Sequence, residues 1–226
     1  MIKTFLILVI LQNLLYSQQI VLVISDNFTT SKAILTCYEE NKVIFKPFEV
    51  NIGKKGLGWG LGEHRFNQKK NDPIKVEGDK KAPAGIFKLT STFGYAKKQN
   101  HKLKYLHLSK NIICVDDSSS LDYNTIIKMP KIKPKSFETM RRDDKQYELG
   151  ISVAHNETQT KQAGSCIFLH VQKSENAGTA GCTSMKLNEI KKIANWLDES
   201  KNPILIQIPH SSLKEIRELY PTLALP

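Results

Sequence analysis

The chain has 226 residues, 40% of them hydrophobic, which is enough for one domain with a buried core. Its formal net charge is +11, and the lysines responsible are scattered, with no run of interleaved aromatic residues. These features argue against a platform for single-stranded nucleic acid, and they favour either a soluble basic surface or an anionic cell-envelope polymer as the partner.

The first 17 residues have the pattern of a secretory signal peptide. Lys3 gives a basic start, residues 5–15 are almost all apolar, and Ser17 is a small residue at a cleavable position. A segment this short does not cross the roughly 30 Å hydrocarbon core of a bilayer, so a membrane anchor is disfavoured. We therefore expect a mature single-domain chain, residues 18–226, that is exported to the periplasm or the cell wall.

Short apolar or alternating runs in the first half of the chain predict β-strands at residues 20–24, 33–38, 43–50, 82–89 and 106–115. The glycine-rich segment 53–62 lacks the Gly-Lys-Ser/Thr ending of a phosphate loop, and it predicts a tight turn or a strand edge. Glu77 and Asp79 flank a glycine in a polar turn. Their carboxylates either make turn and surface contacts or help to order a site.

The segment 136–142 predicts a short helix that Ser136 caps, and either of its two adjacent arginines, Arg141 or Arg142, is a candidate for gripping a carboxylate. A strand at 151–154 then delivers the polar pair His155 and Asn156.

Apolar residues at helical spacing predict a helix over residues 187–197, and residues 203–208 predict a further strand. Ser212 and Glu215 form a capping-box pattern for a last short helix that ends near Tyr220. The whole pattern indicates a mainly β fold with accessory helices.

The four cysteines of an exported chain meet oxidising conditions. Cys114 and Cys166 lie in apolar, strand-like runs, which fits either a disulfide between them or two buried thiols. Cys37 lies in an alternating strand pattern and is expected in the core. Cys182 differs, because it follows small residues that leave a thiol little shielded.

Residues 165–185 carry the strongest functional signal, a histidine and a cysteine joined by a loop. His170 closes an apolar run that predicts a buried strand, and Cys182 follows the turn Thr179–Gly181 at a separation of 182 − 170 = 12 residues. A hairpin-like return over that distance brings the imidazole beside the sulfur, which favours deprotonation of the thiol.

Four interpretations of this pair are open. In nucleophilic catalysis, the thiolate attacks a carbonyl, the amides of Gly181 and Cys182 hold the oxyanion, and His170 moves the proton. A backbone carbonyl would orient the imidazole, because no acidic side chain stands beside it in the sequence. A zinc site with His155 or Cys166 lacks the close ligand pairs that usually mark zinc. The other two are a purely structural cysteine and a binding module without chemistry.

Several short motifs run in one order along the chain, in addition to LH at 169–170 and TAGC at 179–182. They are the WG segment at 58–60, EGD at 77–79, APAGIF at 82–87, FGY at 93–95, CVDD at 114–117, YN at 123–124, ETMRR at 138–142 and HN at 155–156. Together they resemble the L,D-transpeptidases of the YkuD type, over nearly the whole predicted mature chain.

The resemblance implies a β-sandwich catalytic domain in which Cys182 is the acylating nucleophile and His170 the general base. The oxyanion would lie against the amides of Gly181 and Cys182, and no cofactor or metal is implied. The implied partner is a peptidoglycan stem tetrapeptide, which loses its terminal D-alanine and leaves a thioester. Transfer of that acyl group to an amine would give a 3-3 cross-link, and transfer to water would be carboxypeptidase activity.

The chain departs from the commoner pattern of this family at two positions that bear on substrate binding. Histidine is usual where Ala180 stands, and asparagine or arginine is usual where Ser184 stands. We therefore expect other residues to supply the missing substrate contacts. The candidates are Thr179, Arg141, His155 and Asn156.

Overall fold

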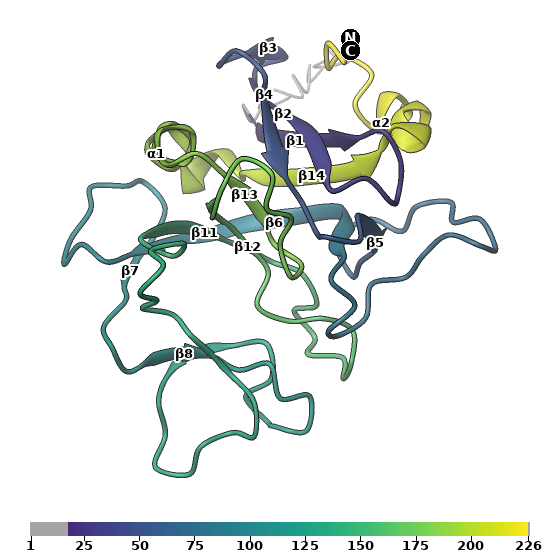
Figure 1. Ribbon diagram of the computed structural model, residues 1–226. Helices are drawn as coiled ribbons and strands as arrows, with labels where there is room; N and C mark the ends of the chain where they lie inside the picture. Colours follow the sequence, from purple (N-terminus) through teal and green to yellow (C-terminus); the bar gives the residue numbers. More distant parts are fainter. Residues whose placement is uncertain (1–17, 226) are drawn as a thin grey trace, which may run out of the picture.

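The computed structural model of the protein (Figure 1) describes residues 18–225, so the expected signal peptide, residues 1–17, lies outside the described residues. Within the described part, none of the helices has the length and apolar character needed to span a membrane.

One large β-sheet organises the chain, and its hydrogen-bond ladder closes on itself. Around the ring the order is β1, β14, β6, β11, β12, β13, β4 and β2, and β2 pairs again with β1. The strands of the ring are β1 (Gln19–Ser25), β2 (Lys32–Glu39), β4 (Phe48–Asn51), β6 (Ala82–Gly94), β11 (Leu149–Val153), β12 (Phe168–Val171), β13 (Thr183–Met185) and β14 (Ile204–Pro209). Three short strands extend this sheet, namely β3 (Lys42–Val43), β5 (Leu57–Trp59) and β7 (Tyr105–His107).

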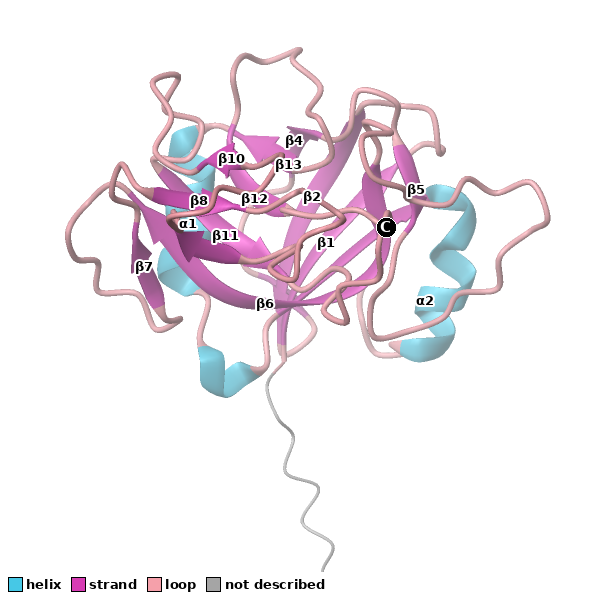
Figure 2. Cartoon of the chain, turned by 90° about the horizontal axis from the view of Figure 1, so that it is seen from below, coloured by secondary structure: helices cyan, strands magenta, loops and turns pink. Residues whose placement is uncertain are grey.

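The mainly β class that the sequence predicts is confirmed, but the arrangement of the sheet differs from the expected sandwich. The ladder of the described strands runs round one barrel-like sheet, whereas a sandwich has two separate sheets. Apolar alternation does not distinguish the two, because each strand buries one face in both. The longest strand, β6, curves across the molecule and pairs with β14 and β11 (Figure 2).

The main core fills this ring and extends under the helices. Helix α1 (Leu187–Trp196) buries Ile190, Ile193 and Ala194 against β11 and β12. This confirms the predicted helix, and it means that α1 supports β12 from behind. Two 3₁₀ turns, η1 (Glu199–Lys201) and η2 (His210–Ser212), flank β14.

The last helix, α2 (Leu213–Leu219), is also present, but without the predicted capping box. Ser212 precedes the helix and makes no side-chain cap hydrogen bond. The Glu215 carboxylate instead accepts from the Asn67 amide at 3.2 Å and contacts Nε2 of His64 at 2.9 Å. A tertiary partner has therefore replaced the local one.

A second, smaller sheet lies away from the ring (Figure 1) and consists of β8 (Ile112–Cys114), β9 (Ile126–Lys128) and β10 (Glu138–Thr139) in the order β10, β8, β9. The helix predicted at 136–142 is wrong, because Glu138 and Thr139 pair with β8 as an antiparallel strand. Met140, which follows them, is fully buried. Pairing and burial have overridden a weak helical propensity.

The small sheet is tied to the ring by a disulfide between Cys114 at the end of β8 and Cys166 just before β12. The sequence left open a disulfide or two thiols, and the structure has the disulfide. Cys37 and Cys182 are free and buried, and Cys37 lies in the core as expected.

Candidate active site

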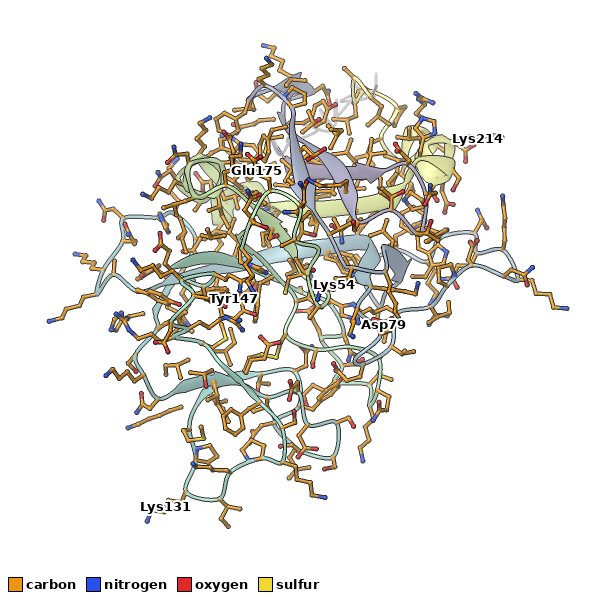
Figure 3. The ribbon with its side chains drawn as sticks, viewed as in Figure 1. Lys54, Asp79, Lys131, Tyr147, Glu175 and Lys214 are labelled. Atoms are coloured by element: carbon orange, nitrogen blue, oxygen red, sulfur yellow. A yellow bond between two sulfur atoms is a disulfide. The ribbon has the colours of Figure 1, made fainter. Side chains whose placement is uncertain are left out.

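His170 and Cys182 line one cavity of 780 Å³. His170 lies on β12, and Cys182 lies immediately before β13, which runs parallel to β12 with His170 opposite Ser184. The parallel pairing places the start of β13 next to the strand that carries the histidine. The loop between the two strands forms one wall of the cavity. In Figure 3, the labelled Tyr147 and Lys54, which also line the cavity, lie in a band across the middle of the view, between the ring and the small sheet.

Cys182 is a free thiol with 7% of its surface exposed. Its Sγ accepts a hydrogen bond from the Phe168 amide at 3.3 Å and donates one to the Cys166 carbonyl at 3.4 Å. Burial, reinforced by the nearby Glu138 carboxylate, raises the pKa of the Cys182 thiol to about 12. The thiol is therefore protonated at rest, and its hydrogen is directed at a carbonyl rather than at the imidazole.

His170 is held by a backbone carbonyl, as the sequence analysis predicted. Its Nδ1 lies 2.8 Å from the Val171 oxygen, and a carbonyl only accepts, so we assign the ring proton to Nδ1. This assignment leaves Nε2 with a free lone pair. Burial lowers the pKa of His170 to about 4. The pair is therefore a neutral thiol and a neutral imidazole, which differs from the deprotonated thiol expected from the sequence.

Thr179 braces the turn that precedes Cys182. Its hydroxyl donates to the Cys182 carbonyl at 2.6 Å and accepts from the Gly181 amide at 3.1 Å. Its backbone is fixed as well, because its amide donates to Ile52 and its carbonyl accepts from Lys54, both at 2.9 Å. Thr179 lines the cavity, but its hydroxyl is already engaged within the turn. One of the two amides expected to hold an oxyanion, that of Gly181, is engaged too.

The family follows from a comparison with known sequences. The sequence model of the YkuD family, described as the L,D-transpeptidase catalytic domain, matches residues 19–206. The chain belongs to this family. No curated protein matches the chain.

One similar solved structure is a mutant of the helical cell shape determining protein Pgp2 from Campylobacter jejuni. It is 16% identical to this chain with a TM-score of 0.39, and the match covers 85% of this chain and 48% of Pgp2. The chain thus spans about half the length of that protein.

Arg141, expected to bind substrate, does not line the cavity of this YkuD domain. Its Nη1 donates to the Leu108 carbonyl at 2.9 Å and to the Tyr95 carbonyl at 3.3 Å, and its guanidinium lies 4.7 Å from the centre of the Tyr95 ring. Arg142 lines the cavity instead. The sequence does not distinguish two adjacent arginines, because which one faces the cavity depends on the path of the backbone after β10.

His155 and Asn156 do not line this cavity either, and both are almost completely buried. The imidazole of His155 accepts from the Leu61 amide at 3.3 Å, and its other nitrogen contacts the Ala163 carbonyl at 3.0 Å. The side-chain amide of Asn156 donates to the carbonyls of Thr160 and Gly164, each at 3.0 Å. The pair organises the loop before β12, and it does not reach Cys182.

Neither of the two residues considered as a third zinc ligand is free to bind a metal. Cys166 is in the disulfide, and both ring nitrogens of His155 are occupied by backbone groups. A zinc site on His170 and Cys182 would need at least one more protein ligand.

Three carboxylates line the cavity of the YkuD domain, and of these the sequence analysis singled out only Glu77. They are Glu77, Asp116 and Glu138. Glu138 accepts from the Tyr147 hydroxyl at 2.6 Å, and burial raises its pKa. Glu77 accepts from the Ser165 hydroxyl at 2.7 Å, whereas one oxygen of Asp116 is buried without a partner. Among the described ion pairs, none includes any of these three side chains.

Cations line the cavity as well, and the sequence analysis missed all of the lysines among them. Lys54, Lys173 and Arg142 lie along it, and Lys75 contributes a side chain that is only 3% exposed. The YkuD cavity therefore offers both charges to a ligand. No local signal marks Lys75 among the many lysines of this chain.

Proposed function

We propose that this chain is a cysteine-dependent L,D-transpeptidase that acts on peptidoglycan stem peptides. Membership of the YkuD family supports the reaction class. The single observation that supports the roles within this chain is the shared cavity, in which a free Cys182 thiol and a His170 ring with an open Nε2 face the same space. Cys182 is the proposed nucleophile, and His170 is the proposed general base.

The neutral pair dictates the order of proton transfers. When the thiol turns from the Cys166 carbonyl, Nε2 of His170 takes its proton as Sγ bonds to the peptide carbonyl carbon before the terminal D-alanine. The tetrahedral intermediate then collapses. The C–N bond breaks, the leaving amine takes the proton from His170, and a thioester remains on Cys182. Because burial disfavours both ions at rest, charge appears only while the reaction proceeds.

The charge of the cavity suits such a donor. A stem peptide carries amine and carboxylate groups together, and this cavity combines the carboxylates of Glu77, Asp116 and Glu138 with the cations Lys54 and Arg142. A purely cationic or purely anionic ligand would leave one set unpaired in a partly buried space. The second substrate is an amine in the cross-linking reaction and water in the carboxypeptidase reaction.

We also propose that the protein works in the periplasm or the cell wall. The disulfide between Cys114 and Cys166 fits an oxidising compartment, and the leader pattern of residues 1–17 supports export. The basic net charge of +11 suits an anionic envelope polymer.

The test detects a covalent adduct between the protein and the donor peptide. The chain from residue 18 onward is incubated with a disaccharide-tetrapeptide, and the intact protein is weighed. An acyl adduct that Cys182→Ala abolishes and Cys37→Ala retains supports the proposal, because Cys37 is the other buried free cysteine. Absence of an adduct, with D-alanine retained on the peptide, would overturn it. The products then separate cross-linked dimers from hydrolysed tripeptide, and a metal chelator should leave acylation unchanged.

A further inference from the structure

Lys75 is a buried cation in the cavity of the proposed nucleophile, and the mechanism has not yet used it. Its ammonium donates to Asp79 at 2.6 Å and to the Val76 carbonyl at 2.8 Å. An ammonium has three hydrogens, so these contacts leave one for another acceptor. Lys75 lines the same cavity as His170 and Cys182. Its partner Asp79 is labelled in Figure 3, near Lys54.

The backbone around Lys75 makes room for its side chain. A Cβ on Gly164 would lie 2.9 Å from Cε of Lys75, and a Cβ on Gly58 would lie 2.9 Å from its backbone nitrogen. Both distances are too short for real atoms, so the lysine fits because glycines stand at these positions. A Cβ on Gly181 would lie 3.8 Å from Nζ. The ammonium therefore lies on the side of Gly181 where a side chain would stand, close to the residue that precedes Cys182.

The site needs a positive group at this point. The Gly181 amide already donates to Thr179, so the oxyanion site has lost one of its two expected donors. Around the thiol, the Glu138 carboxylate raises the pKa of Cys182, while the Lys75 and Arg142 cations lower it. Lys75 thus opposes the unfavourable field of the Glu138 carboxylate at a thiol that is only 7% exposed.

We propose that Lys75 is a further catalytic residue, whose third ammonium hydrogen stabilises the negative charge that forms on Cys182 Sγ and then on the oxygen of the tetrahedral intermediate. This role rests on the function proposed above. Lys75 keeps its own proton throughout, so it adds no bond-making step. Asp79 positions the ammonium and partly neutralises it.

The alternative role is a structural ion pair that holds the turn at residues 76–79. The turn has other support, because the Asp79 carboxylate also accepts from the Val76 amide at 2.9 Å and the Lys81 amide at 2.8 Å. Substitution of Lys75 therefore leaves two of the bonds that define the turn. The two roles are separable by experiment, since a structural pair needs both partners equally, whereas a catalytic cation needs its charge.

The experiment measures the rate at which iodoacetamide alkylates Cys182 at a fixed alkaline pH, without reductant, in a Cys37→Ala background. Lys75→Met should alkylate about threefold to tenfold more slowly, because fewer thiols ionise while each thiolate becomes somewhat more nucleophilic. Asp79→Asn should alkylate faster than the parent, because the ammonium loses its neutralising partner. Lys75→Arg, which keeps the charge, should retain a rate close to the parent.

The same variants are then compared for acylation by the tetrapeptide donor. Lys75→Met should reduce kcat by about 10²-fold with a nearly unchanged KM, the loss typical of an oxyanion donor. The proposal is overturned if Lys75→Met and Asp79→Asn change alkylation in the same direction, or if Lys75→Met lowers only the unfolding midpoint. If Lys75→Met does not fold, Asp79→Asn and Lys75→Arg decide the question. Faster alkylation of Asp79→Asn with a near-parental rate for Lys75→Arg supports the proposal, and slower alkylation of both variants overturns it. Alkylation needs no peptidoglycan, so failure of the wild-type chain to acylate would count against the proposed function and not against Lys75.

Discussion

Tyr147 lies edge-on to His170, with ring centroids 5.2 Å apart and an angle of 79° between the planes. Its hydroxyl donates to Glu138 on β10, so the same side chain contacts the proposed base and the small sheet. Tyr147 thus links two parts of the cavity that are held together covalently only by the disulfide and the chain itself.

This relationship predicts different results for two substitutions at one position. Tyr147→Phe keeps the ring against His170 and removes only the hydrogen bond, so we expect a loss of about 1 kcal/mol in the free energy of unfolding and near-normal acylation. Tyr147→Ala also removes the ring, so we expect acylation to fall at least tenfold as the imidazole loses its support. Urea unfolding and single-turnover acylation measure both effects. Equal acylation rates in the two variants would contradict a positioning role.

The pH at which acid abolishes acylation should be unusually low. His170 must be neutral to accept the thiol proton, and burial lowers its pKa to about 4. We therefore expect the acylation rate to hold from neutral pH down to about 5 and to fall through about 4, in contrast to the ordinary histidine value near 6.5. Initial rates of D-alanine release across this range provide the measurement. A midpoint near 6.5 would mean that the imidazole is hydrated in the working enzyme.

Stability should depend on pH over the same interval. The pKa values of His155 and His170 are both lowered to about 4 by burial, so the unfolded chain binds protons more readily than the folded chain below the usual value of 6.5. The free energy of unfolding is therefore at its full value above about 6.5 and decreases as the pH falls towards 4. Urea midpoints at several pH values test this, and His155→Gln should reduce the slope because one of the two groups is gone.

The disulfide should matter for the site as well as for stability. Cys166 carries the carbonyl that accepts from the Cys182 thiol, and Cys114 ends β8, which pairs with the strand of Glu138. In the double variant Cys114→Ala with Cys166→Ala, we expect a loss of about 2–4 kcal/mol in the free energy of unfolding and slower acylation. Denaturant unfolding and acylation rates provide the measurement. The control is Cys37→Ala, which keeps the disulfide, so a reductant should change its stability and its acylation rate as it changes those of the parent chain.

Substitutions of the two adjacent arginines should have different effects, one on stability and the other on donor binding. Arg141 donates to two carbonyls and stacks on Tyr95, so Arg141→Ala should lower the free energy of unfolding by about 1–3 kcal/mol with KM changed less than twofold. Arg142 lines the cavity and pairs with Asp144 through two bonds, of 2.9 and 2.6 Å. Arg142→Ala should therefore raise KM for the donor. The reverse pattern would restore the carboxylate-binding role that the sequence suggested for Arg141.

The sequence by itself determined the features that depend on local pattern. Apolar period and branched residues gave most strands of the ring and the helix that begins at Leu187, because burial of one face imposes that period wherever the strand pairs. The motifs at residues 169–170 and 179–182 indicated the family, and they singled out His170 and Cys182, which line one cavity. The absence of an acidic neighbour even indicated that a backbone carbonyl orients His170, as the Val171 oxygen does.

Only the tertiary structure decided which side chains share the cavity. His155 and Asn156 are almost completely buried, and they hold their own loop in place of the expected substrate. Strand pairing with β8 replaced the helix predicted at 136–142. Lys75 and Glu138 reach the cavity from segments about a hundred and about forty residues away in sequence from Cys182 (182 − 75 = 107 and 182 − 138 = 44). Residue type fixes what a group can do chemically, but its charge state and its partners are set by neighbours that only the folded chain brings together.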